Sequence, residues 1–407
     1  MSHIIPFKAV RPSKDKVQLV VSRSYEDYRK KELKATLTYN PFSFLHIINP
    51  GFKFHREIAG PERFLLVKNR FDEFREEDIF IKDTQPCFYL YQMRTRNHEF
   101  CGFFCAASVA DYRNDVIRKH ESTIKAREIL FKDYLKTVGF NAEPVLLTYP
   151  DHEGIENIMN DTRKKQPEYH FTTTDKINHQ MWVINDKTKI EAIQAYVRDL
   201  SVVYIADGHH RSASSSLLSE EMKELDPENE KYHYFMSYMI PESSLRIFEF
   251  NRMVKDLNGL SVEDFLIRLD KVFRIEFRGQ EPYKPEQPHH FSMYLDGSFY
   301  SLYLRKNYNF SDPLSELDTQ ILYTEVLKPV LGIKNLRKNN RIAYGYGKDN
   351  LIRMKEQVDN KKFAVGFNLY PVSVEQLKRI ADAGQVMPPK STYIQPKLRS
   401  GLTIYEF

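Results

Sequence analysis

The residues with the greatest capacity for chemistry lie in one short run, Asp207-Gly208-His209-His210-Arg211. The apolar run Val202–Ile205 precedes it and predicts a buried strand, and the apolar residues that follow recur at helical spacing. The polar run therefore lies where a strand leads into the first turn of a helix. The start of a helix offers backbone N–H groups and the positive end of the helix dipole, which suit a phosphate or a carboxylate.

Three interpretations of this run remain open. In the first, a phosphate binds the N–H groups after Gly208, with charge-assisted bonds from Arg211 and close approach allowed by the small Ser212. In the second, Asp207 and one histidine bind a metal ion. In the third, Asp207 caps the helix and the histidines bond to backbone groups. The first is favoured because four polar residues directly after an apolar strand are hard to explain by packing, and we assign no metal ligands.

A second polar cluster lies near the C-terminus, in residues 387–399. Three prolines hold this segment extended and remove backbone donors. It carries four candidate ligands for an anion: Lys390, Ser391, Lys397 and Arg399. The alternative is a rigid surface segment whose charges are only solvated. Further upstream, Glu26 is a candidate general base, although solvated carboxylates are the ordinary explanation of its charged surroundings.

Composition excludes several functional classes. The chain has 407 residues, 42% of them hydrophobic, which is enough for one large core or two ordinary ones. A net charge of only +5 gives no reason to expect nucleic acid as a partner. The sequence shows neither an N-terminal signal pattern nor an apolar run of the roughly 18 residues that span a bilayer. The three cysteines fit a reducing compartment. We therefore expect a soluble cytoplasmic protein that binds small molecules, with a homo-oligomer as a candidate assembly.

The apolar patterns predict an α/β (α+β) fold with mixed sheets and flanking helices. Amphipathic spacing predicts helices over His120–Val138, ended by Gly139, and over Lys189–Leu200. The short apolar run Phe64–Val67 is typical of a strand. Strands and helices alternate up to about residue 228, and strands with a hairpin signal predominate after it. We therefore expect an N-terminal α/β domain over residues 1–228 and a C-terminal α+β domain over residues 229–407.

Several long motifs, in order, resemble a known family. They include Ile5–Pro12, Asn40–His46, His120–Thr123, Ala206–Arg211 and Ala381–Tyr393. With these motifs the chain is identified as a member of the family of domain of unknown function (DUF) 1015. That family has no settled activity.

The Asp207–Arg211 run also resembles the turn of the ParB and sulfiredoxin superfamily, whose members bind nucleotide phosphates at the helix start. The superfamily includes free-serine kinases, and genes of the DUF 1015 family are often neighbours of serine-biosynthesis genes. The resemblance implies a ParB/sulfiredoxin-like core. It also implies phosphoryl transfer, by a kinase or phosphatase, involving serine or phosphoserine, with ADP or ATP and with Mg²⁺ as a candidate companion.

In the mechanism that follows from this resemblance, Gly208 and Arg211 hold phosphate, and His209 or His210 relays a proton or binds the leaving oxygen. Glu26 is the candidate base. The basic residues of the C-terminal cluster would bind a substrate carboxylate or a second phosphate.

The chain departs from the family pattern at two places. Arg23-Ser24-Tyr25-Glu26 stands where the family has Pro-Pro-Tyr-Asp, and Asn251 stands where it has a histidine before arginine. If these positions are catalytic in the family, the two substitutions would abolish turnover in this chain. The chain would then be a nucleotide- or metabolite-sensing regulator. A metal-dependent hydrolase is a further alternative.

Overall fold

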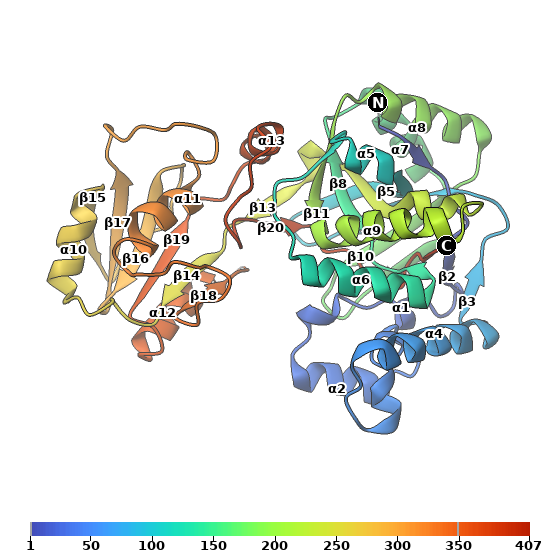
Figure 1. Cartoon of the computed structure of the whole chain (residues 1–407), viewed down its shortest axis with the longest axis horizontal. Helices are drawn as coiled ribbons and strands as arrows, with labels where there is room; N and C mark the ends of the chain where they lie inside the picture. The colour runs from blue at the N-terminus through green and yellow to red at the C-terminus, as the bar shows by residue number, and fades with distance from the viewer. Residues whose placement is uncertain (1, 348–349) are drawn as a thin grey trace. The chain divides into compact units, whose positions relative to one another are not determined.

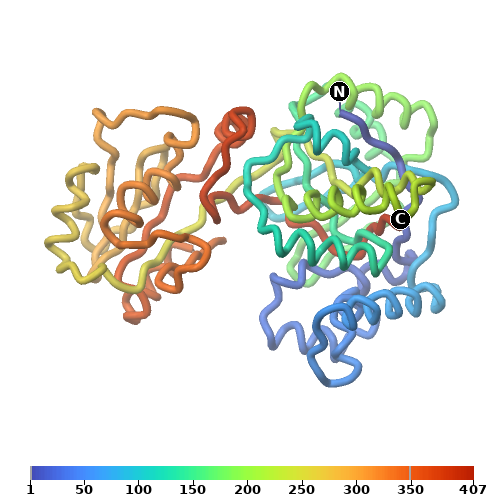
Figure 2. Tube along the Cα trace, in the orientation of Figure 1, coloured from blue at the N-terminus to red at the C-terminus, as the bar shows by residue number. Residues whose placement is uncertain are grey.

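The computed structural model describes residues 2–347 and 350–407, which form two compact units (Figures 1 and 2). The first unit contains the residues up to Lys119 together with Thr123–Leu245 and Pro396–Phe407. The second contains His120–Ser122 and Arg246–Gln395. The chain therefore leaves the first unit and returns to it at its C-terminus.

The first unit is built on a large mixed sheet with helices around it. Its strands are β1 (Ile4–Ile5), β4 (Phe88–Arg94), β5 (Glu99–Ser108), β6 (Ile117–Arg118), β8 (Val145–Tyr149), β9 (Tyr169–Thr172), β10 (Asn178–Ile184), β11 (Val203–Asp207) and β12 (Tyr234–Pro241). The short strands β2 (Val10–Pro12) with β3 (Phe80–Lys82) and β7 (Phe140–Asn141) with β21 (Tyr405–Glu406) form separate pairs.

The helices of this unit are α1 (Val17–Val20), α2 (Lys30–Tyr39), α3 (Leu45–Ile48), α4 (Gly60–Glu76), α5 (Val109–Arg113), α6 (Lys125–Val138), α7 (Glu153–Arg163), α8 (Lys187–Asp199) and α9 (His209–Leu225). Short 3₁₀ turns are η1 (Tyr25–Asp27), η2 (Pro50–Phe54), η3 (Glu230–His233) and η4 (Glu242–Ser244).

Strand order in the large sheet is β6-β11-β8-β12-β5-β4-β10-β9, with β1 beside β5. Strand β12 runs parallel to β8, whereas β11 runs antiparallel to β8, so the sheet is mixed. The C-terminal end of β11 therefore lies at one end of the sheet, and the C-terminal ends of β8 and β12 lie at the other. These two ends hold different groups of polar residues.

The C-terminal segment, residues 396–407, completes the first unit. Its Ser400 exchanges backbone hydrogen bonds with Ser22, and Ile404 does the same with Val10. Strand β21 then pairs with β7, and Figure 2 shows this red end of the chain beside blue N-terminal segments. The buried Ile404 belongs to an apolar cluster with Phe44, which α4 helps to cover.

The second unit contains a smaller antiparallel sheet in the order β15-β17-β16-β19-β14-β18 and a separate antiparallel pair, β13 with β20. Its strands are β13 (Arg246–Phe248), β14 (Asn251–Val254), β15 (Phe273–Gly279), β16 (His290–Leu295), β17 (Ser298–Leu304), β18 (Ile342–Gly345), β19 (Val365–Leu369) and β20 (Tyr393–Gln395). Its helices are α10 (Val262–Asp270), α11 (Asp318–Leu322), the π-helical turn η5 (Tyr323–Leu327), α12 (Asn350–Asp359) and α13 (Val374–Asp382).

These elements confirm the expected mixed α/β fold with flanking helices. The helix predicted over residues 189–200 is α8. The helix predicted over residues 120–138 begins later, at Lys125, and ends as expected at Gly139, which has a left-handed φ of 75°. The strand predicted at Phe64–Val67 is wrong, because those residues lie in α4. A proline in the first turn of α4 favours a helix start, and Phe64, Val67, Phe71 and Phe74 are buried at helical spacing.

The boundary expected after residue 228 also differs from the two units. Strand β12 follows that boundary in sequence but pairs with β5 and β8 inside the first unit's sheet. The composition change near residue 228 marks the loop after α9 rather than the end of a core.

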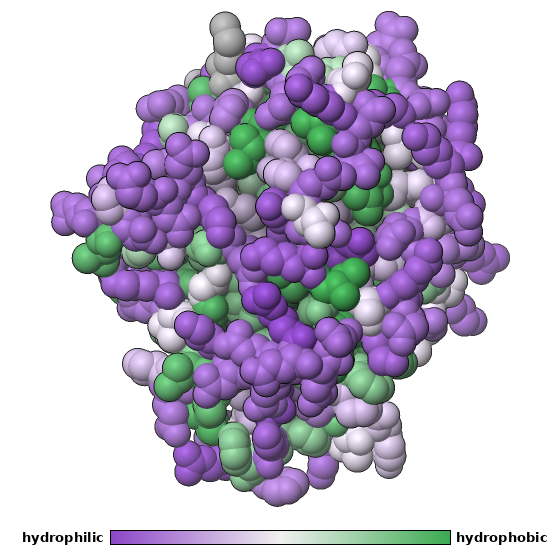
Figure 3. Space-filling view, turned by 90° about the vertical axis from the view of Figure 1, so that its right-hand side faces the viewer, coloured by the Kyte–Doolittle hydropathy of each residue, from purple (hydrophilic) through white to green (hydrophobic). Residues whose placement is uncertain are grey.

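Hydrophilic side chains cover most of the face shown in Figure 3, with hydrophobic side chains in small groups between them. None of the described helices is both long enough and apolar enough to cross a bilayer.

The close pairing of β5 with β12 depends on Gly102. A Cβ atom placed there would lie 2.1 Å from the carbonyl oxygen of Met239, which is backbone and cannot turn aside. We expect Gly102→Ala to lower the free energy of unfolding by about 2 kcal/mol or more. Urea unfolding followed by the fluorescence of Trp182, the single tryptophan, which is buried in this sheet, measures the change.

The matched control is Gly139→Ala, where the added Cβ would meet open space but the left-handed φ of 75° is unfavourable. We expect a loss of about 1 kcal/mol there. Equal losses in the two variants would contradict the close approach at Gly102.

Candidate functional site

The predicted strand, turn and helix around residue 207 are present as β11, Gly208 and α9. Gly208 has a φ of 104°, which side-chain-bearing residues rarely adopt. A Cβ atom there would also lie 3.3 Å from both the guanidinium carbon of Arg211 and the Cα atom of Val145. Glycine is therefore required at this position both by the backbone conformation and by the packing of Arg211 over the turn.

Arg211 folds back over the turn and bonds to both sides of it. Its Nη2 atom lies 3.1 Å from Asp207 Oδ2, and Nη1 donates to the backbone carbonyl of Pro144, just before β8. A guanidinium has five N–H donors, so these contacts leave donors for a further acceptor. Arg211 thus holds the turn against the neighbouring strand and retains capacity to bind an anion.

Lys397 reaches the same turn from the C-terminal segment. Its Nζ atom lies 3.5 Å from Asp207 Oδ1, although the two residues are 190 positions apart in sequence. Burial would raise the pKa of the Asp207 carboxyl, but Lys397, Arg211 and His209 together hold it below its ordinary value. Asp207 is therefore an ionised carboxylate with cations on two sides.

His209 is buried at the first position of α9. Burial lowers its pKa to about 4, and the charge of Asp207 only partly opposes this, while His210, Arg211 and Lys119 reinforce it. The imidazole is therefore neutral at physiological pH, so it can donate or accept a hydrogen bond but does not carry a ready proton. His210, the next residue, is half-buried.

Ser212 lies one turn into α9 with its side chain fully buried. Its hydroxyl donates to the backbone carbonyls of His209, at 3.1 Å, and Gly208, at 3.4 Å. Such bonds to the preceding turn are common for serine inside helices. In this arrangement the hydroxyl is engaged inside the helix, and its role as a phosphate ligand stays a prediction.

The acidic turn η1 belongs to the same unit as Asp207. Glu26 is exposed, whereas the adjacent Asp27 is half-buried. Burial raises the pKa of Asp27; Lys397 and Arg23 oppose this, and Glu26 and Asp207 reinforce it. Asp27 therefore lies within the electrostatic reach of the Asp207–Lys397 pair. The sequence predicted Glu26 as the candidate base. Asp27 is the alternative, because it is half-buried whereas Glu26 is exposed, a difference that the sequence does not reveal.

Arg399 is the most buried cation of the C-terminal segment, with 5% of its side chain exposed. Its Nη2 atom lies 2.8 and 2.6 Å from the two carboxylate oxygens of Asp175 and 3.2 Å from Thr173 Oγ1. Its Nε atom is buried without a hydrogen-bond partner among the described residues. An unsatisfied buried donor of a charged group is costly, so this atom marks a place where a ligand oxygen or an ordered water would be stabilising.

A buried histidine extends the cluster behind Arg399. His179 Nε2 lies 3.1 Å from Thr173 Oγ1, and Nδ1 lies 2.7 Å from the hydroxyl of Tyr91. Burial lowers the pKa of His179 to about 3, with Arg399 reinforcing the effect and Asp175 opposing it. His179 is therefore a neutral residue that orients Thr173. The sequence signal was weak, since His179 opens an ordinary apolar strand.

Arg23 links η1 to this second cluster. Burial would lower its pKa, but the hydroxyl of Tyr28 and the charges of Glu32 and Asp175 raise it above the ordinary value. Its guanidinium also packs over the Tyr28 ring, 4.3 Å from the centroid. The departure from the family pattern at Arg23 thus adds a cation to the first unit.

Two predicted ligands of the C-terminal cluster, Lys390 and Ser391, belong to the second unit. The Lys390 amine lies 5.4 Å from the centroid of the Phe250 ring, and Lys390 has a left-handed φ of 60°. The Ser391 hydroxyl is buried and bonds to Thr319 and to the carbonyl of Pro388. The cluster that appeared continuous in sequence is thus divided between the units, and only Lys397 and Arg399 lie in the unit of Asp207.

The second departure from the family pattern, Asn251, is also in the second unit. Its side chain is fully buried in β14 and accepts a hydrogen bond from Asn368 of the neighbouring strand β19. The departure at Asn251 therefore lies inside the sheet of the second unit, away from solvent.

The Arg399–Asp175 pair should contribute strongly to stability. We expect Asp175→Asn to lower the free energy of unfolding by about 3 kcal/mol, because it leaves the buried guanidinium of Arg399 without its counter-charge. Urea unfolding, followed by Trp182 fluorescence, measures this change in the free energy of unfolding. The control is Asp161→Asn, which breaks a surface ion pair with Lys189 and should change stability little. A loss at Asp175 no larger than at Asp161 would contradict the assignment.

The opposite pKa shifts of Asp27 and Asp207 predict opposite pH dependences. A raised folded-state pKa means that wild-type stability falls as pH rises from the unfolded pKa, about 3.9, through the folded value. Asp27→Asn should therefore stabilise the protein at pH 7, and the gain should shrink towards pH 4. The lowered pKa of Asp207 means that Asp207→Asn should destabilise at pH 7, and the loss should shrink only as pH falls below the unfolded pKa of about 3.9. Melting temperatures between about pH 2 and pH 8 test both signs; the same sign for both variants would contradict this charge arrangement.

Comparison with solved structures finds distant likenesses. A free serine kinase in complex with AMP is 12% identical with a TM-score of 0.37, covering 74% of this chain and 91% of that chain. SbnI from Staphylococcus aureus, with a C-terminal truncation, is 14% identical with a TM-score of 0.37, covering 74% and 85%. A conserved hypothetical protein from Pyrococcus furiosus is 13% identical with a TM-score of 0.34, covering 74% and 95%. With TM-scores this low, these likenesses bear on neither substrate nor activity.

No protein of curated function matches the sequence significantly. A family model, by contrast, matches residues 4–320, which include the whole of β11, Gly208 and α9. The chain therefore belongs to the family described as protein of unknown function (DUF1015).

Proposed function

We propose that the first unit transfers a phosphoryl group between a nucleotide, ADP or ATP, and a small hydroxy substrate of the serine or phosphoserine class. The observation that carries this proposal is the position of Lys397, 3.5 Å from Asp207 directly before α9. It adds a second cation, beside Arg211, to a helix N-terminus. Two cations and a helix dipole together favour a multiply charged phosphate.

The present partners of these cations suggest how phosphate would be bound. Lys397 makes a long contact to Asp207 and is 35% exposed, so its amine can turn towards a ligand oxygen. Arg211 is held more firmly, by Asp207 and by the carbonyl of Pro144. Arg211 would therefore act as a fixed bidentate donor, and Lys397 as a point charge on a longer side chain.

Asp27 is the best-placed proton acceptor for the substrate hydroxyl. Its raised pKa brings it closer to neutrality than an ordinary carboxylate, which suits a general base. Glu26, on the same turn, is exposed and remains the alternative. His209, being neutral, would hydrogen-bond the leaving oxygen, and His210 adjoins it.

Arg399 would bind the carboxylate of an amino-acid substrate. Its buried Nε atom has no partner among the described residues, and its charge is held in place by Asp175. It follows Lys397 by two residues in the same segment. This arrangement supports one cation for phosphate and one for the substrate.

The residues present also fit a divalent cation. An oxygen ligand such as the carboxylate of Asp207 is the type that Mg²⁺ prefers. When bound, Mg²⁺ would neutralise charge on the phosphates of the nucleotide. The backbone N–H groups after Gly208, at the start of α9, would bind the nucleotide phosphates.

Calorimetric titration with ADP and ATP, with and without serine or phosphoserine, tests the proposal, together with detection of phosphorylated product. We expect Lys397→Met to weaken nucleotide binding about tenfold through loss of a charge-assisted bond. Asp27→Asn should keep nucleotide affinity but lower the rate of transfer at least a hundredfold.

The matched control is Lys187→Met, which removes an amine that is 88% exposed in the same unit. It should leave binding and transfer unchanged. Absence of nucleotide binding by the wild type, or equal effects at Lys397 and Lys187, would refute the phosphate site.

A nucleotide- or metabolite-sensing regulator is the second candidate. The observation that favours it is the ionised Asp207, which already compensates part of the positive charge of Arg211 and Lys397. The same titrations separate the two functions: nucleotide binding with no transfer by the wild type, with either co-substrate, assigns the regulator.

A further inference from the structure

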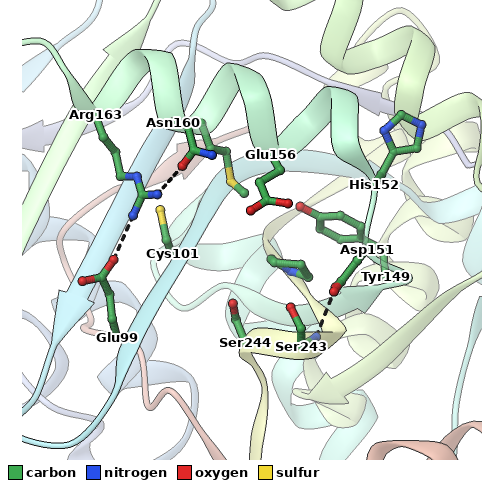
Figure 4. A pocket seen from close by; sticks show the side chains of 12 residues that line it. Glu99, Cys101, Tyr149, Asp151, His152, Glu156, Asn160, Arg163, Ser243 and Ser244 are labelled. Carbon is green, nitrogen blue, oxygen red and sulfur yellow. Dashed lines mark hydrogen bonds and ion pairs between the residues drawn. The ribbon is translucent and has the colours of Figure 1, made fainter.

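A cavity of about 190 Å³ lies at the end of the first unit's sheet opposite Gly208 (Figure 4). Strands β8 and β12, which are parallel and aligned at Tyr149 and Pro241, both end there. Ligands of open sheets commonly bind outside the carboxyl ends of parallel strands. At about 30 Å³ per water, the cavity holds roughly six waters or a small organic molecule.

Helix α7 supplies one wall of the cavity with a polar stripe. Glu156, Asn160 and Arg163 are spaced by four and three residues, so they share one face of the helix. Figure 4 shows their side chains on the same side of α7. His152, the N-cap of the helix, accepts a hydrogen bond from the backbone N–H of Ile155 and also lines the cavity.

Tyr149 points into this cavity with its hydroxyl on the side of Glu156 (Figure 4). The side chain is 1% exposed, and its hydroxyl has no hydrogen-bond partner among the described residues. A buried hydroxyl without a partner costs about 1–3 kcal/mol, so such groups are normally satisfied by a ligand or an ordered water. Tyr149 therefore marks a binding position inside the cavity.

The cavity carries uncompensated negative charge. Arg163 is paired with Glu99 at 2.8 Å and also bonds to Asn160, and Glu99 is shared with Arg94, which points to solvent. The carboxylates of Asp151 and Glu156 lie at the solvent-exposed rim of the cavity and make no ion pair with any described residue. Within residues 2–347 and 350–407, the hydrogen bond that Asp151 accepts comes from the backbone N–H of Ser243, at 3.1 Å.

Two further titratable groups near these carboxylates are uncharged and leave the negative charge as it is. Burial raises the pKa of the Tyr149 hydroxyl well above its ordinary value, and Cys101, Asp151 and Glu156 raise it further. Burial likewise raises the pKa of Cys101 to about 12. The phenol and the thiol are therefore uncharged, and the two carboxylates leave a net attraction for a cation.

We propose that this cavity binds a small organic molecule that carries a protonated primary amine. Glu156 and Asp151 accept hydrogen bonds from the ammonium group, and the Tyr149 oxygen accepts a further one. The bound molecule has about six non-hydrogen atoms, by the volume of the cavity. This site is separate from the phosphate site proposed at α9 and does not depend on it.

Other ligand classes fit the cavity less well. Two unpaired carboxylates repel phosphates and carboxylates. A preformed metal site needs several donor atoms close together, and within the described residues no three carboxylate, imidazole or thiol groups of this cavity gather within 4.8 Å. An ammonium ion, with three N–H donors, matches two carboxylates and a hydroxyl.

The full-length protein is titrated with 1,4-diaminobutane and with ethanolamine, by calorimetry and thermal shift, and acetate serves as an anion of similar size. We expect both amines to bind and to raise the melting temperature, and acetate to do neither. Glu156→Gln and Tyr149→Phe should each weaken amine binding at least about tenfold, because each removes a hydrogen bond to a charged group. Tyr149→Phe should not lower the melting temperature without ligand, because it removes an unsatisfied hydroxyl.

Glu153→Gln is the matched control, since Glu153 is, like Glu156, an exposed carboxylate of α7 but does not line the cavity. It should leave amine binding unchanged. The proposal is overturned if neither amine binds, which would leave ordered water as the partner of Tyr149. Equal affinities in Glu153→Gln and Glu156→Gln, or equal binding of acetate, would also overturn it.

Discussion

The return of the C-terminal segment into the first unit is the constraint on which the rest of the structure depends. The segment is fixed by backbone hydrogen bonds from Ser400 to Ser22 and by the buried ion pair between Arg399 and Asp175. Because Arg399 is buried, the pair leaves little freedom in where the segment runs. Lys397, two residues earlier, is thereby held next to Asp207. The charge environment of α9 is thus set by a segment that is remote in sequence.

Carboxylates and cations oppose one another around Asp207. Lys397 and Arg211 keep this carboxylate ionised, whereas burial raises the pKa of Asp27 in spite of Lys397 and Arg23. Carboxylates in one unit that shift in opposite directions are suited to different roles, one as a fixed charge and the other as a proton acceptor. The neutral His209 adds hydrogen-bonding capacity without adding charge.

The mixed sheet separates two polar regions of opposite character. Since β11 runs antiparallel to β8, the start of α9 and the start of α7 lie at opposite ends of the sheet. The α9 end gathers cations, and the α7 end holds the carboxylates of Asp151 and Glu156, which form no ion pair within the part of the chain that the structure describes. An anionic ligand and a cationic one can therefore bind the same unit without competing. Strand β12, parallel to β8, closes the second region.

The sequence by itself determined what depends on neighbouring residues. The strand, the turn and the helix around Gly208 follow from local apolar spacing and from the need for glycine at a left-handed φ, and α8 follows from its periodicity. A short apolar run alone did not distinguish a strand from a helix. Phe64–Val67 has the composition of a strand, but its buried residues recur at helical spacing in α4. Only the tertiary structure decided that Lys397 lies beside Asp207 and that Asp27 is more buried than Glu26. Contacts between residues so far apart depend on the packing of whole elements, which no local pattern encodes.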